Sequence, residues 1–463
     1  MPGPLPQGRL VLYNFLLSRA SHMSGARDAS GVFEGELNVS YVRVTRRRLC
    51  AAITTVLAVT FGAGAVSTPA SASPFSVDVV AAVGPTSAED GVTLVRHTVP
   101  SVIDLSTKTY FEMNWTLTGA GWATVVLRHT RTGITTKHLL ADGGNPGTFT
   151  LFWDAHASNI GDVPNGDYTW TLTAETLNGT PLDFQASGSF KLVRKTAPHD
   201  FNDNGSLDII RRDDHGGLWR TDTTIYAGGT LDQEFHQFIG RGWEIYDQIE
   251  ATGNLGGTAV GDLLARDRSG VLWLYQGNGR GGFATRTKVG TGWQIYDKIA
   301  AGSDLTNDGR ADVIATDKSG GLWLYPGTGN ASTPFTARKK IGTGWNIYNE
   351  LTAVGDIAGG AAGDLVARDK SGVLWQYLGK GDGTFAPRTK IGGGWNTYGW
   401  LIGAGDVTKD GRPDLLGGIN ALPHSGANDS LYLYRATGDW RAAFAPVQQS
   451  SVYNPGYTWD KIA

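Results

Sequence analysis

The sequence contains very little sulfur and no excess of either charge. Of its 463 residues, one is cysteine, Cys50, and three are methionine. A single thiol excludes an internal disulfide framework, and no cysteine and histidine cluster has the spacing of a zinc site. The 40 Lys and Arg residues nearly balance 43 Asp and Glu, for a formal net charge of -3. This balance argues against a nucleic-acid partner.

The familiar catalytic motifs are absent as well. The sequence has no G-x-S-x-G nucleophile elbow, no H-E-x-x-H metal motif and no G-x-x-x-x-G-K-[ST] phosphate loop. We therefore expect no enzyme activity. Glycine, by contrast, is abundant at 65 residues, and 15 residues are tryptophan. Tight turns and aromatic packing predict an all-β fold.

Residues 1–72 are typical of a targeting segment. Arginines at positions 46 to 48 precede an apolar stretch, 49–66, and the small residues 70–72 follow it. This order predicts a secretory signal peptide that is cleaved after about Ala72, and therefore an extracellular protein with no membrane span in the mature chain. An apolar stretch of about 18 residues leaves a single-pass membrane anchor as the competing interpretation.

β-rich runs recur through residues 73–196, at 92–97, 110–117, 122–129, 148–153, 168–173 and 189–193. Gly, Asn, Asp and Pro separate them, and short strands at this spacing predict an Ig-like β-sandwich. The segment from Phe152-Trp-Asp to Val163-Pro-Asn-Gly-Asp-Tyr-Thr-Trp170 resembles the Ig-like domain of flagellar hook-capping proteins. That resemblance implies a spacer or assembly module.

Residues 197–463 form a repeat with a period of about 50 residues. Gly-Trp-x-x-Tyr occurs four times, and a strand that carries Trp219, Trp273, Trp323, Trp375 or Tyr432 occurs five times. We assign these strand aromatics to packing. About four short strands per repeat, joined by Gly-rich turns, predict a β-propeller. Five units favour a five-bladed ring, and we expect a monomer.

The repeats resemble a known family. The D-x-[DN]-x-[DN]-G-x-x-D turn, an apolar strand and the S-G-x-L-W-x-Y strand are similar to those of FG-GAP and VCBS repeat proteins, many of which are secreted by bacteria. The resemblance covers about residues 198 to 463. It implies a propeller with calcium-binding acidic turns and a role in adhesion or in binding glycans or proteins. The Gly-x-Gly-Trp-x-x-Tyr element is also similar to that of tachylectin, a five-bladed lectin.

Three acidic turns carry oxygen-bearing side chains at positions 1, 5 and 9 and glycine at position 6, a pattern that suits calcium. The candidate ligands are Asp200, Asn202, Asn204 and Asp208 in the first turn, Asp304, Asp308 and Asp312 in the second, and Asp406, Asp410 and Asp414 in the third. Threonine at position 3 predicts weaker binding in the last two turns. The alternative is that these side chains cap tight turns through local hydrogen bonds.

The Gly-Trp-x-x-Tyr elements supply the candidate carbohydrate-binding rings, because the C–H face of a sugar stacks on an aromatic ring. They are Trp243 and Tyr246, Trp293 and Tyr296, Trp345 and Tyr348, and Trp395 and Tyr398. Burial in the core is the alternative.

We expect a secreted, non-catalytic binding or adhesion protein for an extracellular glycan or protein ligand. The other classes are a spacer, and a hydrolase with carboxylates such as Asp213, Asp214 and Asp429 on one propeller face.

Overall fold

The computed structural model describes residues 91–142, 147–157, 161–194, 197–225, 231–360, 362–419, 431–449 and 459–463. The predicted signal peptide and its cleavage site lie outside these residues. The described elements are β-strands and four 3-10 helices, so the all-β prediction is confirmed for this part of the chain. None of its helices is long and apolar enough to cross a membrane.

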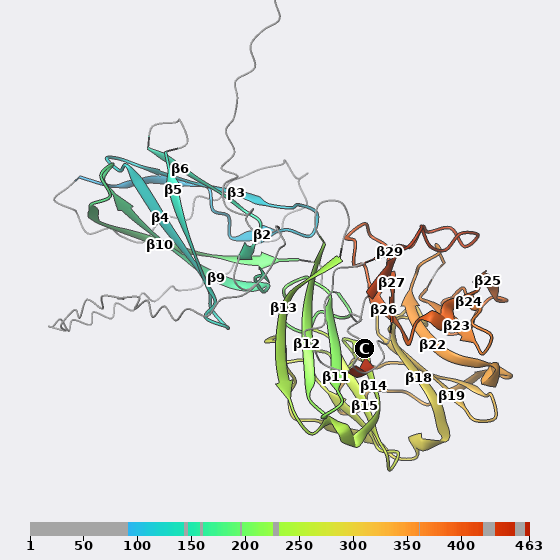
Figure 1. Cartoon of the computed structure of the whole chain (residues 1–463). Helices are drawn as coiled ribbons and strands as arrows, with labels where there is room; N and C mark the ends of the chain where they lie inside the picture. The colour runs from blue at the N-terminus through green and yellow to red at the C-terminus, as the bar shows by residue number, and fades with distance from the viewer. Residues whose placement is uncertain are drawn as a thin grey trace, which may run out of the picture. The chain divides into compact units, whose positions relative to one another are not determined.

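Two sheets are formed by residues between 94 and 193 (Figure 1). The first has the order β1 (Leu94–His97), β3 (Phe111–Leu117), β6 (Thr148–Trp153), and the second has the order β2 (Val102–Asp104), β10 (Pro181–Val193), β9 (Gly166–Glu175), β4 (Trp122–His129), β5 (Thr135–Ala141). A short pair, β7 (His156–Ala157) and β8 (Gly161–Asp162), lies outside them. Only β2 and β10 pair in parallel among these strands.

The two sheets share one hydrophobic core because their strands alternate buried and exposed residues. Trp115 of β3 and Trp170 of β9 meet edge to face in this core, with ring centroids 5.8 Å apart. Each of the six predicted runs contains a described strand, whereas β2 and β5 were not predicted. Their sequences show no alternation strong enough to mark them.

Residues 208–463 form five four-stranded sheets, numbered here sheet 1 to sheet 5 (Figure 1). Sheet 1 contains β13 (Leu231–Gly240), β12 (Leu218–Ile225), β11 (Asp208–Asp213) and β30 (Trp459–Ile462); sheet 2 contains β14 (Tyr246–Gly253), β15 (Asp262–Asp267), β16 (Leu272–Tyr275) and β17 (Thr287–Gly290); sheet 3 contains β18 (Tyr296–Ser303), β19 (Asp312–Asp317), β20 (Leu322–Tyr325) and β21 (Lys339–Gly342). Sheet 4 contains β22 (Tyr348–Gly355), β23 (Asp364–Asp369), β24 (Leu374–Tyr377) and β25 (Thr389–Gly392), and sheet 5 contains β26 (Trp400–Gly405), β27 (Asp414–Gly418), β28 (Leu431–Tyr434) and β29 (Gln448–Gln449). These repeated antiparallel sheets have the form of propeller blades.

Sheet 1 takes strands from two distant parts of the chain. Its strand β30 pairs with β11, with Arg211 opposite Ile462. The sequence 459–463 repeats the sequence 296–300 of β18 because both supply the first strand of a sheet. Pairing of this kind removes an exposed strand edge.

Candidate ligand-binding site

Each Gly-Trp-x-x-Tyr element lies where the chain passes from one sheet to the next. We call these four places seam 1 (between sheets 1 and 2) to seam 4 (between sheets 4 and 5). The tryptophans open the 3-10 helices η1 (Trp243–Ile245), η2 (Trp293–Ile295), η3 (Trp345–Ile347) and η4 (Trp395–Thr397). The preceding glycines have φ between 79° and 91°. This left-handed backbone favours glycine and explains why it is retained in all four copies.

At three of the four seams, an arginine from the preceding sheet holds the Gly-Trp-x-x-Tyr element in place. Arg266 of β15 donates Nη1 hydrogen bonds to the carbonyl oxygens of Trp293 and Tyr296, at 3.2 and 2.6 Å. Arg212 and Arg368 make the same pair of bonds at seams 1 and 4. The aromatic pairs are therefore held by charge-assisted bonds between neighbouring sheets.

All eight predicted carbohydrate-binding rings are buried. The exposed fraction is 6–8% for Trp243, Trp293, Trp345 and Trp395, and 1–7% for Tyr246, Tyr296, Tyr348 and Tyr398. Each tryptophan packs against a tyrosine of the third strand of the following sheet, with ring centroids 4.4–4.6 Å apart. The structure thus places these rings in the core at every seam, as the packing alternative describes. The strand aromatics Trp273, Trp323 and Trp375, which we assigned to packing, are half-buried at the edges of the same clusters.

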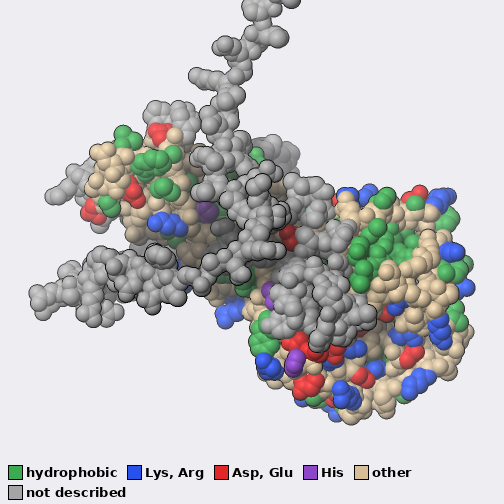
Figure 2. Space-filling view, viewed as in Figure 1, with side chains coloured by type: hydrophobic (Ala, Val, Ile, Leu, Met, Phe, Trp, Pro, Cys, Tyr) green, Lys and Arg blue, Asp and Glu red, His purple; other side chains and the backbone are tan. Residues whose placement is uncertain are grey.

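At seam 4 a cavity of about 510 Å³ opens beside Trp395 and Tyr398. Its walls come from β25, the η4 turn and the loop between β28 and β29. Trp440, on that loop, is 42% exposed. Figure 2 shows hydrophobic side chains gathered over the part of the propeller where Figure 1 places β27 and β29. Neither Trp440 nor the cavity is predicted by the repeat, because Trp440 has no counterpart in the other units.

A second, smaller cavity of about 60 Å³ is lined by the first strands of the sheets. Glu250 of β14 and Glu350 of β22 both face it, together with the buried His199. Burial raises the pKa of Glu250 to about 8 and that of Glu350 to about 7. Its size leaves room for water but not for a sugar ring.

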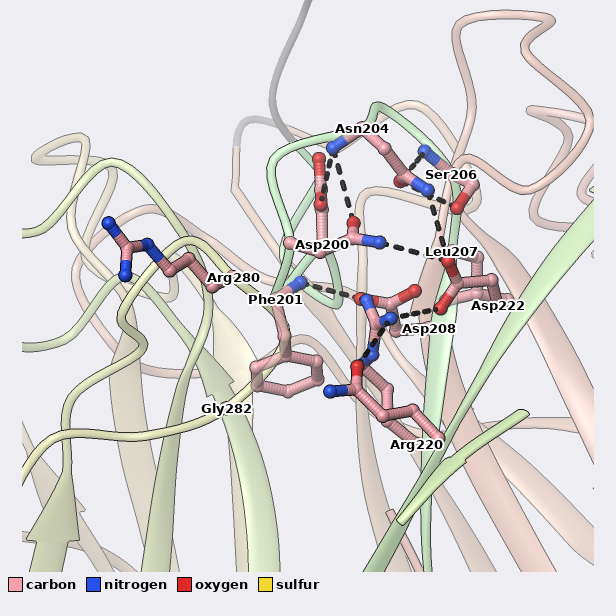
Figure 3. A network of polar contacts seen from close by, with 12 residues as sticks. Asp200, Phe201, Asn204, Ser206, Leu207, Asp208, Arg220, Asp222, Arg280 and Gly282 are labelled. Atoms are coloured by element: carbon pink, nitrogen blue, oxygen red, sulfur yellow. Dashed lines mark hydrogen bonds and ion pairs between the residues drawn. The ribbon is translucent and has the colours of Figure 1, made fainter. Parts of the chain in front are cut away.

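The first acidic turn is a closed hydrogen-bond network (Figure 3). The carboxylate of Asp200 is buried and accepts the N–H groups of Asn204 and Gly205, at 3.1 and 2.8 Å. Burial raises the pKa of Asp200 to about 7. The side-chain amides of Asn202 and Asn204 donate to the carboxylate of Asp222, at 2.9 and 3.2 Å. Asp222 lies outside the repeated positions, so the sequence pattern did not indicate it.

The aspartate at position 9 of the turns has a role that does not depend on the turn motif. Asp312 accepts the N–H groups of Leu305, Thr306 and Gly327 at 2.8–2.9 Å. Asp364 accepts equivalent bonds, although its turn lacks the calcium pattern. Position 9 therefore ties each turn to its sheet.

The predicted calcium ligands do not converge fully. In the first turn, one carboxylate oxygen of Asp208 already accepts two hydrogen bonds, from the N–H of Phe201 at 2.7 Å and from Nη1 of Arg220 at 3.2 Å. Within the described residues, one group of three carboxylate or imidazole side chains has ligand atoms within 4.8 Å of one another, at Asp213, Asp214 and His215. The oxygens of Asp304, Asp308 and Asp312, or of Asp406, Asp410 and Asp414, do not form such a group. Besides positions 1 and 5, the second and third turns keep a buried position 3 hydroxyl without a hydrogen-bond partner among the described residues, at Thr306 and Thr408.

Two of the hydrolase candidates, Asp213 and Asp214, lie together, with carboxylate oxygens within 4.8 Å of each other and of a ring nitrogen of His215. Asp213 accepts the N–H of Gly217 at 2.7 Å and the indole N–H of Trp219 at 2.7 Å, so its carboxylate shapes a turn. Asp214 lies beside His215 at an exposed position. Asp429 lies outside the described residues.

Comparison with known proteins supports the repeat. The model of the FG-GAP-like repeat family matches residues 362–417, from β23 to β27. Residues 362–417 are thus similar to an FG-GAP-like repeat. No curated relative matches the sequence.

Solved structures give weak matches. The lectin BP39L from Burkholderia pseudomallei is 14% identical with a TM-score of 0.30, and the match covers 72% of this chain and 96% of that chain. Sqt1 from Saccharomyces cerevisiae is 10% identical with a TM-score of 0.27, covering 75% and 84%. A mutant of AofleA from Arthrobotrys oligospora is 10% identical with a TM-score of 0.26, covering 63% and 85%. These scores are too low to inform on function.

Proposed function

We propose that this chain is a secreted, non-catalytic protein that binds an extracellular glycan through its propeller. The cavity at seam 4 carries the proposal. It combines an exposed tryptophan ring, Trp440, with polar and charged side chains on the surrounding walls. Aromatic surfaces that take the C–H face of a sugar, with polar groups for its hydroxyls, are the usual elements of a carbohydrate site.

The proposal includes the arrangement of the sheets into two domains. Five sheets closed by β30 would form a five-bladed ring, and the preceding pair of sheets would be an Ig-like spacer. Calcium stays a prediction for positions 1 and 5 of the acidic turns, where it would support the ring by binding the folded state. The monomeric state stays a prediction.

A glycan array tests the function. The purified protein, detected with an antibody to an added terminal tag, is expected to bind a subset of immobilised saccharides, and Trp440→Ala is expected to lose most of that binding. Trp323, half-buried beside Arg338 at seam 2, offers the control, because Trp323→Phe changes sheet 3, which supplies no described residue to the seam 4 cavity. An array without any bound saccharide, in calcium and in chelator, would refute the proposed function.

A further inference from the structure

The four seams share one core but differ in how they are closed. At every seam the tyrosine of the Gly-Trp-x-x-Tyr element and the tyrosine of the following third strand join their hydroxyls. At seam 2, for example, the Tyr296 and Tyr325 oxygens are 2.7 Å apart. A phenylalanine of the same sheet packs beside the third-strand tyrosine and the seam tryptophan; at this seam Phe335 packs beside Tyr325 and Trp293. The inner layer of the seam is therefore constant, and differences among seams arise outside it.

An arginine covers this layer at seams 1, 2 and 3. It lies three residues after the phenylalanine, at Arg286, Arg338 and Arg388. Each guanidinium lies over the tryptophan of the third strand, 4.0–4.3 Å from its centroid, and also donates to the seam tyrosine hydroxyl. Such stacking combines cation–π attraction with a hydrogen bond. The arginine thus acts as a plug at each of these three seams.

Seam 4 has no such plug. Three residues after Phe444 the chain has Val447, and the third strand carries Tyr432 where the other sheets have tryptophan. The turn also changes, because Gly393 replaces the Arg or Thr of the other seams and Thr397 replaces isoleucine. Val447, Gly393 and Thr397 all line the cavity of about 510 Å³. Loss of the arginine and of two larger side chains accounts for the cavity at this seam.

The charges on the cavity walls indicate the class of sugar. Lys390 and Arg441 line it, and its other described lining residues carry no charge. The nearest acid on the loop, Asp439, is 3.7 Å from Arg441 and neutralises part of its charge, and the Arg441 guanidinium is 4.5 Å from the Trp440 centroid. A net positive wall beside an exposed indole suits a ring that carries a carboxylate.

We infer that seam 4, opened by the loss of the arginine plug, is the ligand site among the four described seams and that it takes an acidic sugar, a uronic- or sialic-acid residue. This inference rests on the proposed glycan-binding function. The cavity volume accommodates one or two sugar rings. Recognition of a carboxylate by Lys390 and Arg441 also predicts that added salt weakens binding, because exposed charges are screened.

The decisive variant is Val447→Arg, which restores the plug residue at seam 4. Binding is measured to polyuronates, to sialylated oligosaccharides and to their neutral counterparts, with the melting temperature as the folding check. We expect the wild-type protein to prefer one acidic set, and we expect Val447→Arg to weaken that binding at least tenfold with an unchanged melting temperature. Whether uronate or sialate arms bind identifies the source of the carboxylate.

Two further variants separate charge from shape. Lys390→Gln with Arg441→Gln is expected to lower the affinity about tenfold or more, whereas Lys288→Gln, at the equivalent strand position of plugged seam 2, leaves it unchanged. Normal binding of a saccharide by folded Val447→Arg would overturn the seam 4 site and leave the glycan-binding function standing. Equal binding of neutral saccharides would overturn the acidic class. Absence of all saccharide binding would overturn both proposals.

Discussion

The aspartate at position 9 shows how a single residue type serves all five units of the repeat. It opens β11, β15, β19, β23 and β27 and accepts backbone N–H groups from the turn in all five units. In the last four it also accepts a backbone N–H from the segment after the third strand. A buried acceptor of two or three N–H groups cannot be removed without leaving those groups unpaired. Its recurrence in units without the calcium pattern follows from this role.

Replacing that aspartate should destabilise the fold strongly. Asp312→Ala leaves the N–H groups of Leu305, Thr306 and Gly327 without their acceptor, and we expect the free energy of unfolding to fall by about 2–3 kcal/mol. Asp308→Ala is the matched control, because Asp308 is exposed and its bonds are local to Arg310. Denaturant unfolding in chelator measures both. Equal losses in the two variants would contradict the assigned role.

At the scale of the turn, the three candidate calcium loops share one backbone shape. Position 4 has a positive φ in each, at Asp203 (64°), Asn307 (56°) and Lys409 (57°), and glycine follows at position 6. In the second and third turns, Asp304 and Asp406 at position 1 hold this shape by accepting the N–H groups of positions 5 and 6. Local hydrogen bonds therefore set the conformation of the loop. A bound cation would stabilise that conformation further.

Calcium should raise the melting temperature if positions 1 and 5 hold it. We expect a stabilisation of about 2–3 kcal/mol at a calcium concentration near 100 times the dissociation constant. The triple variant Asp200→Ala, Asp304→Ala and Asp406→Ala should lose that gain, whereas Asp382→Ala, in a turn outside the pattern, should keep it. Thermal unfolding in calcium and in chelator is the measurement, and identical melting curves for the wild-type protein would remove calcium from the proposal.

The strands were more predictable from the sequence than the site was. A repeat of glycine, aspartate and aromatic residues fixes where strands begin and turns occur, so most described strands fall where the pattern puts them. The cavity beside Trp395 depends instead on which side chain the next sheet supplies three residues after a phenylalanine, and at seam 4 this is Val447 rather than arginine. Asp222 was missed for a related reason: it contacts Asn202 and Asn204 only through the pairing of β11 and β12. Contacts between segments outside the repeat register leave no periodic signal.

At the scale of the whole propeller, sheet 1 depends on its last strand. Trp459 of β30 is buried, and the Arg211 guanidinium lies 5.4 Å from its ring centroid. We expect Trp459→Ala to lower the free energy of unfolding by about 3–5 kcal/mol, because it empties a core position and weakens the pairing of β30 with β11. Trp440→Ala, on an exposed loop, should cost less than about 1 kcal/mol. Chemical denaturation distinguishes them, and a small loss for Trp459→Ala would show that β30 is dispensable.

The first strands of the sheets also give the propeller a dependence on pH. Glu250 and Glu350 line the small cavity between these strands, and burial raises their pKa to about 8 and about 7. Gln248, which donates to Glu250 at 2.9 Å, and the cations Arg266, Lys461, Arg368 and Lys298 act in the opposite direction but do not cancel the effect. The folded protein therefore keeps protons on these carboxyls at pH values where the unfolded chain has released them.

Because the folded protein keeps these protons, its free energy of unfolding is expected to fall as the pH rises. An acid whose folded pKa is raised contributes full stability below its unfolded pKa, near 4.5, and the contribution is lost as pH rises toward the folded value. Between pH 6.5 and 8.5 we expect the free energy of unfolding to fall by about 1–3 kcal/mol. His199, whose pKa burial lowers to about 4, opposes this fall only near pH 6.5, where the unfolded imidazole, with a pKa near 6.5, is still partly protonated. Asp200 and Asp364, with pKa values raised to about 7, add to the fall.

The double variant Glu250→Gln and Glu350→Gln isolates the pair, because glutamine keeps the shape of the side chain and cannot ionise. Its unfolding free energy, measured by denaturant titration at several pH values, should decline less between pH 6.5 and 8.5 than that of the wild-type protein, and the difference between the two proteins is free of the Asp200 and Asp364 contributions. Glu112→Gln, on an exposed edge of β3, should retain the full wild-type decline. Parallel pH curves for the double variant and the wild-type protein would mean that the two glutamates are ionised in the folded propeller and that the surrounding cations, not burial, determine their charge.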